Sequence, residues 1–512
     1  MTRTVIVQSE EKDSVGHCHY QLEWNLLPMD IQELVLDQLH YGVSSGSLST
    51  SYAKLASVCR EWQLRFEPLA FRHLDLESST LGDFEKYIKR VENRRSYING
   101  ITFQVKLNTY RKYLRLRRET QKDRFDNNVV FTKQVTRLFQ TLGRMYSGYD
   151  FTRQRYNHGM ELELVVSCDS DSDPGGTTVY VNRFYNSRID WHMDTYESEQ
   201  GACVALPLLP MFDKFIMSRQ SHRIINPRTL SLILSYLPQI KVVVLEPWLN
   251  PFDEEEDWIQ LVEALPSHVY RISACEVFSS YRCDVPMDKS DWHVRRRPAL
   301  AKVLIDSTVH LENVSLLNLI DARHFFADFW PGSQSRRCGG GVATLPELPR
   351  WDNLQLLTLT ANWCRPDGTI DDVTDNILLA AARAVLRMPR LQMLQIYTEG
   401  AGSINYQPAL LCYEAHDAHT TLFCATAWST DVSRHVVRAW ETVADHNTRH
   451  ELRFVHEGAS AWLATRIKCA ADMHLLLKRG REIIDPESHK EFEWFGLKDE
   501  SEIEWFGLPD ES

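Results

Sequence analysis

Residues 373–396 read VTDNILLAAARAVLRMPRLQMLQI, a helical pattern that passes through Pro389 into a short strand-like pattern. Up to Met388 the aliphatic residues recur at three- and four-residue spacing, as they do on one face of a helix. Proline cannot continue a helix, and after it Leu391, Leu394 and Ile396 form an LxxLxL signature. The stretch therefore predicts one helix followed by one strand, which is the unit of an α/β repeat.

The same signature recurs through the second half of the chain, at intervals of about 29, 42, 43 and 37 residues. Its steps are Ile240, Val243, Leu245; Val269, Ile272, Ala274; Leu311, Val314, Leu316; Leu354, Leu357, Leu359; and Leu391, Leu394, Ile396. Helical patterns separate the steps at 227–237, 258–265, 299–309 and 373–388, and further strands are expected at 101–107, 162–167, 178–182, 421–428 and 451–455. We expect an irregular leucine-rich-repeat-like α/β array, horseshoe-like, whose parallel strands line one face.

The segment from Leu26 to Leu76 has a different pattern, that of short amphipathic helices. Pro28 suits the first turn of a helix, and the aliphatic residues after it recur on one side. A Gly- and Ser-rich gap follows, and a second apolar stripe begins at Tyr52 and is expected to stop before Pro68. A unit of roughly 40 residues cannot bury such faces by itself. From periodicity alone, the segment is either a helical hairpin of the core or a docking module.

Family resemblance favours the docking module. The patterns LPxDI, LAxVCREW and EPxxFRxLxL resemble the N-terminal F-box of a family of filamentous-fungal F-box domain-containing proteins. Leu27, Pro28 and Ile31 match its first helix, and Leu55, Val58, Cys59, Arg60, Glu61 and Trp62 match its second. In F-box proteins these helices dock onto a Skp-type linker subunit of a cullin ubiquitin ligase. The resemblance therefore implies a partner-binding surface made of Leu27, Pro28, Ile31, Leu34, Val35 and Leu55.

The resemblance extends over residues 20–485, through blocks at 219–248, 321–326, 378–396 and 436–444. For this family the F-box alone carries an implied biochemical role. The domain organisation that we predict is a disordered leader at 1–19, the F-box-like helical module at 20–76, a connecting α/β region at 77–225, the repeat-like region at 226–480 and an acidic tail at 481–512.

Composition agrees with an intracellular adaptor. The 512 residues are 43% hydrophobic, with no apolar run near the roughly 18 residues that cross a bilayer. Eleven cysteines without close pairs are typical of a reducing compartment, so we expect a cytoplasmic or nuclear protein without a membrane partner. The net charge of −12 argues against nonspecific nucleic-acid binding. The basic run at 110–118 still leaves a nuclear or nucleic-acid role as a third alternative.

Other clusters predict no catalytic or metal site. Asp169, Asp171 and Asp173 begin like a calcium loop, but Pro174 and Tyr180 stand where such a loop needs Gly and Glu. The acids at 253–257 are explained by the dipole of the following helix, without a basic partner. His17, Cys18 and His19 lack zinc spacing. The sequence has no GxSxG, GxxxxGK[ST], HExxH or CxxC, and we expect neither an enzyme nor a cofactor.

The expected function is that of a noncatalytic substrate-recognition adaptor of a Skp–cullin–F-box ubiquitin ligase. In that reading the helical module binds the Skp-type linker, and the repeat-like region binds an unknown protein substrate. The main alternative is a repeat scaffold in a complex unrelated to ubiquitin, in which the helical hairpin belongs to the core. The sequence EWFGL occurs twice, at 493–497 and 504–508. It is either a short docking motif, a recent duplication without a role, or part of a tail that folds back on the repeat-like region.

Overall fold

The fold is taken from a computed structural model of the chain. It describes residues 10–12, 18–20, 24, 27–44, 51–110, 119–148, 159–170, 188–192, 206–221, 223–247, 255–275, 297–331, 348–361, 373–398, 409–416, 418–426, 432–457, 473–474, 476–484 and 488. These residues belong to two compact units. The N-terminal unit comprises Met1–Leu74 and Ile88–Gly100, and the second unit comprises Asp75–Tyr87 and Ile101–Ser512.

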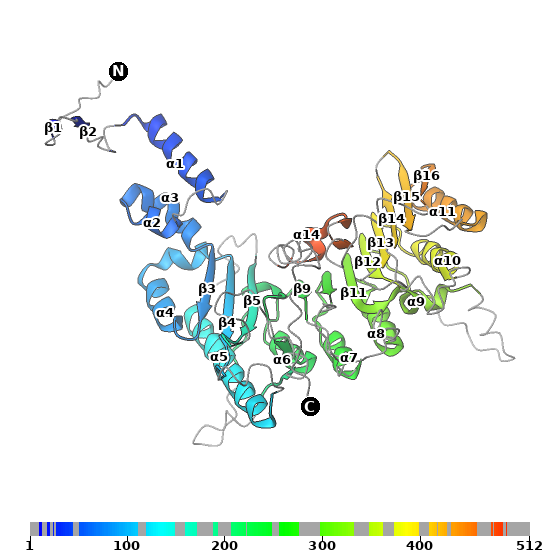
Figure 1. The fold of residues 1–512 in the computed structure, drawn as a ribbon, viewed down its shortest axis with the longest axis horizontal. Coiled ribbons are helices and arrows are strands. Elements are labelled where there is room, and N and C mark those ends of the chain that lie inside the picture. The colour runs from blue at the N-terminus through cyan, green and yellow to red at the C-terminus, as the bar shows by residue number, and fades with distance from the viewer. Residues whose placement is uncertain are drawn as a thin grey trace, which may run out of the picture. The chain divides into compact units, whose positions relative to one another are not determined.

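The N-terminal unit is mainly helical (Figure 1). Its elements are an antiparallel pair, β1 (Glu10–Lys12) and β2 (Cys18–Tyr20), followed by α1 (Met29–Ser44), α2 (Tyr52–Ala56), α3 (Arg60–Ala70) and the 3-10 helix η2 (Glu92–Tyr97). Strand β3 (His73–Glu77) and helix α4 (Leu81–Arg90) each run across a boundary between the units. The three successive helices α1, α2 and α3 are the part of the chain in which the sequence predicted an F-box-like module.

The expectation of a single second helix that stops before Pro68 was wrong. Helix α2 ends at Ala56, and α3 begins after Cys59, whose backbone is extended (φ −157°, ψ 175°). Pro68 lies inside α3, where it deprives the carbonyl of Leu64 of its helical partner. Leu64 is an exposed residue, so water can satisfy that carbonyl and the helix continues to Ala70.

A twelve-stranded, mostly parallel sheet is the central feature of the rest of the fold (Figure 1). Its strand order is β16-β15-β14-β13-β12-β11-β10-β9-β7-β5-β4-β3. After β3, the strands are β4 (Gly100–Lys106), β5 (Met160–Ser167), β7 (Phe212–Met217), β9 (Val242–Leu245), β10 (Arg271–Cys275), β11 (Asn313–Asp321), β12 (Leu356–Thr360), β13 (Met393–Thr398), β14 (Ala409–Ala415), β15 (Thr420–Thr426) and β16 (Leu452–Glu457). A separate parallel pair joins β6 (Arg188–Ile189) to β8 (Ile224–Ile225).

Helices connect most of these strands. They are α5 (Gln121–Tyr146), α6 (Pro227–Ser235), α7 (Glu255–Glu263), α8 (Pro298–Thr308), α9 (Ala322–Phe325), η7 (Ala327–Phe329), α10 (Val373–Val385), α11 (Arg434–Asn447) and α14 (Gly480–Ile483). Helices α6, α7, α8, α10 and α11 lie along one side of the sheet, and α14 lies away from them (Figure 1). Among the residues that the structure describes, no helix combines the length and the apolar character that crossing a bilayer requires.

The LxxLxL steps are confirmed as strands β9 to β13. Their second positions, Val243, Ile272, Val314, Leu357 and Leu394, are register partners across five neighbouring strands. The third positions, from Leu245 to Ile396, form a parallel row. Both rows are buried, and side chains of the first three strands line a small apolar cavity with Trp258 and Leu261 of α7. The signature thus predicted the side of the sheet that the helices cover.

Residues that alternate with these rows point to the opposite side of the sheet and include many polar side chains. Ser273, Ser315, Thr358, Gln395 and Cys412 are register partners from β10 to β14. We call this side the strap face, because the C-terminal residues 473–474, 476–484 and 488 lie against it. We call those residues the strap.

The regular alternation of strand and helix ends at β13. Strand β14 is antiparallel to both β13 and β15, and the turn between β14 and β15 contains no helix. Tyr413 of β14 stacks at 5.2 Å on Trp440 of α11, and α11 packs against α10. The sequence did not predict β7, β14 or the 26-residue helix α5. The strand expected at 178–182 lies outside the described residues.

Replacing Leu357 by Ala should destabilise the second unit by about 2–5 kcal/mol, because its side chain is fully buried between sheet and helices. Chemical denaturation followed by circular dichroism measures this loss. Leu208→Ala is the matched control, since Leu208 is exposed and its truncation should cost less than about 0.5 kcal/mol. Equal losses in the two variants would contradict the assignment of the apolar rows to the core.

Candidate partner-binding surfaces

Helix α1 is attached to the N-terminal unit mainly through polar and aromatic contacts. The indole Nε1 of Trp24 donates to Glu61 at 2.8 Å, and its ring lies edge-on to Trp62 at 5.1 Å. Tyr52 stacks on His40 and hydrogen-bonds to its ring. The side chains that α1 turns toward α2 and α3 are therefore partly polar, which leaves its aliphatic residues incompletely covered.

The exposed side of α1 is an apolar stripe. Ile31, Leu34 and Tyr41 are spaced three and seven residues apart, so they lie on one face of the helix, and Met29 precedes them. Their exposed fractions are 40% for Ile31, 56% for Leu34, 69% for Tyr41 and 76% for Met29. The only buried residue of this 16-residue helix is Gly42. We call Ile31, Leu34 and Tyr41 the α1 patch, since Met29, two residues before Ile31, projects from another side of the helix.

The residues predicted to bind a Skp-type linker fall into three groups. Pro28, Ile31 and Leu34 are exposed, whereas Leu27 and Val35 are half-buried. Leu55 is buried, with 6% of its surface exposed, and it is the one buried residue of α2. The structure therefore brings Ile31 and Leu34 together on an accessible surface and places Leu55 inside the unit.

An ion pair secures the end of the helical module. The Arg94 Nε of η2 lies 2.5 Å from Glu67 of α3, and both side chains are largely buried. Arg94 also lies over the ring of Phe71. The hydrogen bond from Arg94, outweighing burial, holds the pKa of the Glu67 carboxyl below its usual range. This pair therefore stabilises the module while the carboxylate is ionised.

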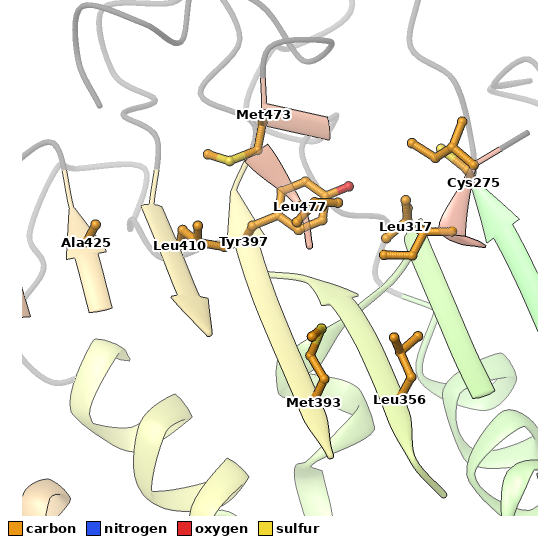
Figure 2. Packing of buried hydrophobic residues seen from close by; sticks show 11 residues of the cluster. Cys275, Leu317, Leu356, Met393, Tyr397, Leu410, Ala425, Met473 and Leu477 are labelled. Atoms are coloured by element: carbon orange, nitrogen blue, oxygen red, sulfur yellow. The ribbon is translucent and has the colours of Figure 1, made fainter. Parts of the chain in front are cut away.

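A second candidate surface is the strap face of the sheet. Met473, Leu477, Ile483 and Ile484 of the strap are buried in one cluster with side chains from β10 to β15. Figure 2 shows Leu477 beside Tyr397 of β13, with Met473 close above them. Ser488 accepts a hydrogen bond from the backbone N–H of Arg219, two residues after β7 ends.

Polar groups of the strands hold the backbone and side chains of the strap. The Gln395 amide donates to the carbonyl of Lys478 at 3.1 Å and accepts its N–H at 2.8 Å. The Lys478 ammonium donates to Glu414 at 2.5 Å, and His474 hydrogen-bonds to the Tyr397 hydroxyl at 2.9 Å. The Ser273 hydroxyl donates to the carbonyl of Ile483. These contacts involve both the backbone and the side chains of the strap.

Two buried cysteines, Cys412 and Cys424, lie on opposite sides of this sheet. Burial, together with the charge of Glu414, raises the pKa of Cys412 to about 12. Burial likewise raises the pKa of Cys424 to about 12. Cys412 lies on the strap face as the register partner of Gln395, whereas Cys424 pairs with Leu411 in the helix-facing row. Both thiols are therefore neutral near pH 7 and shielded by different elements.

A buried polar network that the sequence did not reveal lies at the start of α5. Glu119 accepts hydrogen bonds from Tyr110, Asn127 and Arg223 within 2.9 Å, and the Arg223–Glu119 ion pair is essentially fully buried. Burial and the adjacent carboxylate raise the pKa of Tyr110, so its hydroxyl stays a donor. The network joins residues more than 100 positions apart, which explains why no local pattern predicted it.

One of the acidic residues at the start of α7, Asp257, has basic partners, contrary to the expectation of simple helix capping. Asp257 is buried and pairs with Arg188 and with Arg228, whose Nε lies 2.5 Å away. These three residues line a polar cavity of about 300 Å³ together with Arg124, Asp190 and Asn226. The carboxylates already neutralise most of its positive charge, so the cavity is not an evident anion site.

Several predicted clusters lie outside the described residues. They include Asp171 and Asp173, residues 111–118 of the basic run, His17, and the duplicated tail motif at 493–497 and 504–508. Within the described ranges, no three His, Cys, Asp or Glu side chains are grouped so that they could hold a metal ion.

Comparison with known proteins gives one match. Residues 264–485 match a family of unknown function, DUF6546. The matched region begins just before β10 and ends next to Ile484, so it includes the strap as far as Ile484 and leaves out Ser488 and the helical module. No curated protein matches the chain.

Replacing Arg94 by Met should destabilise the N-terminal unit more at pH 7 than at acid pH. The pKa of Glu67 is lowered in the folded state, so its contribution is present above the unfolded pKa and is lost as pH falls through the folded value. Thermal unfolding of both chains at pH 7 and pH 3.5 measures the difference.

The control is Arg65→Met, which breaks the exposed pair between Arg65 and Asp37 and should change the melting temperature little at either pH. A pH-independent effect of Arg94→Met, or an equal effect of Arg65→Met, would argue against the role assigned to the Glu67 carboxylate.

Proposed function

We propose that the chain is a noncatalytic substrate-recognition adaptor of a Skp–cullin–F-box ubiquitin ligase. Its N-terminal helices bind the Skp-type linker subunit, and its sheet-containing unit, an irregular horseshoe-like repeat array, binds a protein substrate in the cytoplasm or nucleus. The adaptor accelerates modification by proximity alone, because it holds the substrate near the ubiquitin-loaded enzyme.

The observation that carries this proposal is the α1 patch. A soluble monomer rarely leaves neighbouring large apolar side chains exposed unless another surface covers them. Ile31 and Leu34 are two of the residues that the F-box resemblance assigns to the linker interface, and both are exposed on one stripe of α1. Helix α1 contacts α2 and α3 through polar groups, which leaves its apolar side accessible to a partner.

The alternative is a repeat scaffold in a complex unrelated to ubiquitin. It is favoured by Leu55, which the resemblance places at the linker interface but which is buried in the N-terminal unit. Leu27 and Val35 are half-buried and fit either proposal. The two proposals differ in the partner of the α1 patch, so a binding experiment separates them.

The double variant Ile31→Asp, Leu34→Asp should weaken binding to a purified Skp-type subunit by about 100-fold, since buried apolar anchors dominate such interfaces. Both residues are exposed, so the fold should survive, which circular dichroism checks. Binding is measured by pull-down and by titration calorimetry with the full chain.

Phe125→Asp is the matched control, because Phe125 is 53% exposed on α5 and far from the helical module in sequence. It should bind as the unmodified chain does. Absence of binding by the unmodified chain, or equal binding by the double variant, would refute the adaptor proposal and favour the scaffold.

A further inference from the structure

Besides its buried side chains, the strap is held through its backbone. Gln395 is 1% exposed, and its amide pairs with both backbone groups of Lys478, as a neighbouring strand would. Ser273 binds a second backbone carbonyl, that of Ile483. Contacts of this kind accept any peptide that presents its main chain at these points.

Selectivity comes from one charge and from the apolar positions around it. The Lys478 ammonium pairs with Glu414, whose carboxylate is largely buried and also lies 3.2 Å from His416. Met473 and Leu477 before the lysine, and Ile483 after it, occupy the apolar part of the strap face. The face therefore fits a basic residue between large apolar ones.

The strap is not in an ideal conformation. Arg479, directly after Lys478, has a left-handed backbone with φ of 55°, a region that is unfavourable for a residue with a side chain. Helix α14 is a single turn of four residues. Lys478 is about half exposed, so water weakens its ion pair with Glu414. A peptide without the left-handed residue could make the same contacts with less strain.

We propose that the strap face, at Ser273, Gln395, Tyr397 and Glu414, is a peptide-binding surface that the strap occupies in cis. Its partner in trans is a protein segment that carries a lysine between large apolar residues and displaces the strap. The inference rests on the proposed function only in regarding that segment as part of the substrate. Peptide exchange on this face needs no Skp-type subunit, so the two can fail separately.

The test uses a fluorescent peptide with the chain's own sequence 471–488 and the full chain carrying Lys478→Glu. The substitution places a carboxylate beside Glu414, which loosens the strap but leaves the strap face unchanged. The peptide, which keeps its lysine, should bind this variant about tenfold or more tightly than it binds the unmodified chain, because less of the face is blocked. Fluorescence anisotropy measures both affinities.

Two controls accompany this measurement. Lys302→Glu reverses an exposed lysine of α8 and should leave peptide binding unchanged. A second chain that combines Lys478→Glu with Gln395→Ala should lose the gain, because the peptide backbone then has no amide to pair with. A peptide that binds all of these chains equally would overturn the proposal.

Thiol alkylation mapped by mass spectrometry tests the opening directly. In Lys478→Glu, Cys412 on the strap face should react at least about tenfold faster than in the unmodified chain, while Cys424 on the helix-facing side keeps its rate. If either the Cys412 rate or peptide binding is unchanged, the strap is a fixed part of the core and the proposal fails.

Faster alkylation of Cys424 would show that Lys478→Glu unfolds the sheet. In that case the measurements are repeated with Lys478→Met in place of Lys478→Glu, because methionine removes the ion pair with Glu414 without adding a second carboxylate. The added fluorescent peptide still carries the lysine that the Lys478→Met chain lacks. Tighter peptide binding, together with faster alkylation of Cys412 and an unchanged alkylation rate of Cys424, supports the proposal. Unchanged binding or an unchanged Cys412 rate overturns it.

Discussion

The burial of two in-register rows of aliphatic side chains beneath the helices is the constraint on which the second unit depends. Five neighbouring strands contribute one side chain each to the row that runs from Val243 to Leu394. Each such side chain contributes about 1.5–3 kcal/mol when fully buried. A shift of one residue in any strand would turn its aliphatic side chains toward the strap face and its polar side chains toward the helices. The rows therefore specify the register as well as the stability of the sheet.

The same alternation produces a second surface with different chemistry. Because the aliphatic residues are committed to the helices, the other side of the strands can carry side chains such as Gln395 and Glu414, whose hydrogen-bonding groups need partners when buried. The strap supplies those partners in this structure. The α1 patch of the N-terminal unit is instead apolar and has few polar groups to satisfy. The two surfaces thus differ in chemistry: the α1 patch is apolar, and the strap face combines apolar side chains with hydrogen-bonding groups.

Local patterns predicted the parts of this fold that depend on neighbouring residues. The LxxLxL steps located β9 to β13 because period-two burial and the helices between strands are both visible in sequence. The patterns did not reveal β14, because an apolar strand looks alike whichever direction it runs, nor the pairing of Glu119 with Arg223, which depends on the assembled fold. The patterns also predicted α2 and α3 as one helix, because the apolar stripe continues across Cys59 although the helical backbone conformation is interrupted there. In the helical module, spacing identified Ile31 and Leu34 as one stripe, but burial of Leu55 depends on packing that spacing does not express.

The antiparallel strand β14 also determines how the space beside it is filled. A parallel strand needs a long crossover connection, usually a helix, whereas only residues 416–419 separate β14 from β15. Tyr413 of β14 and Trp440 of α11, stacked at 5.2 Å, fill space on the helix-covered side of the sheet. These two positions are therefore coupled by volume. In related chains with the same hairpin, a smaller residue at one of them should be accompanied by a larger residue at the other, and a chain with small residues at both would need an additional helix.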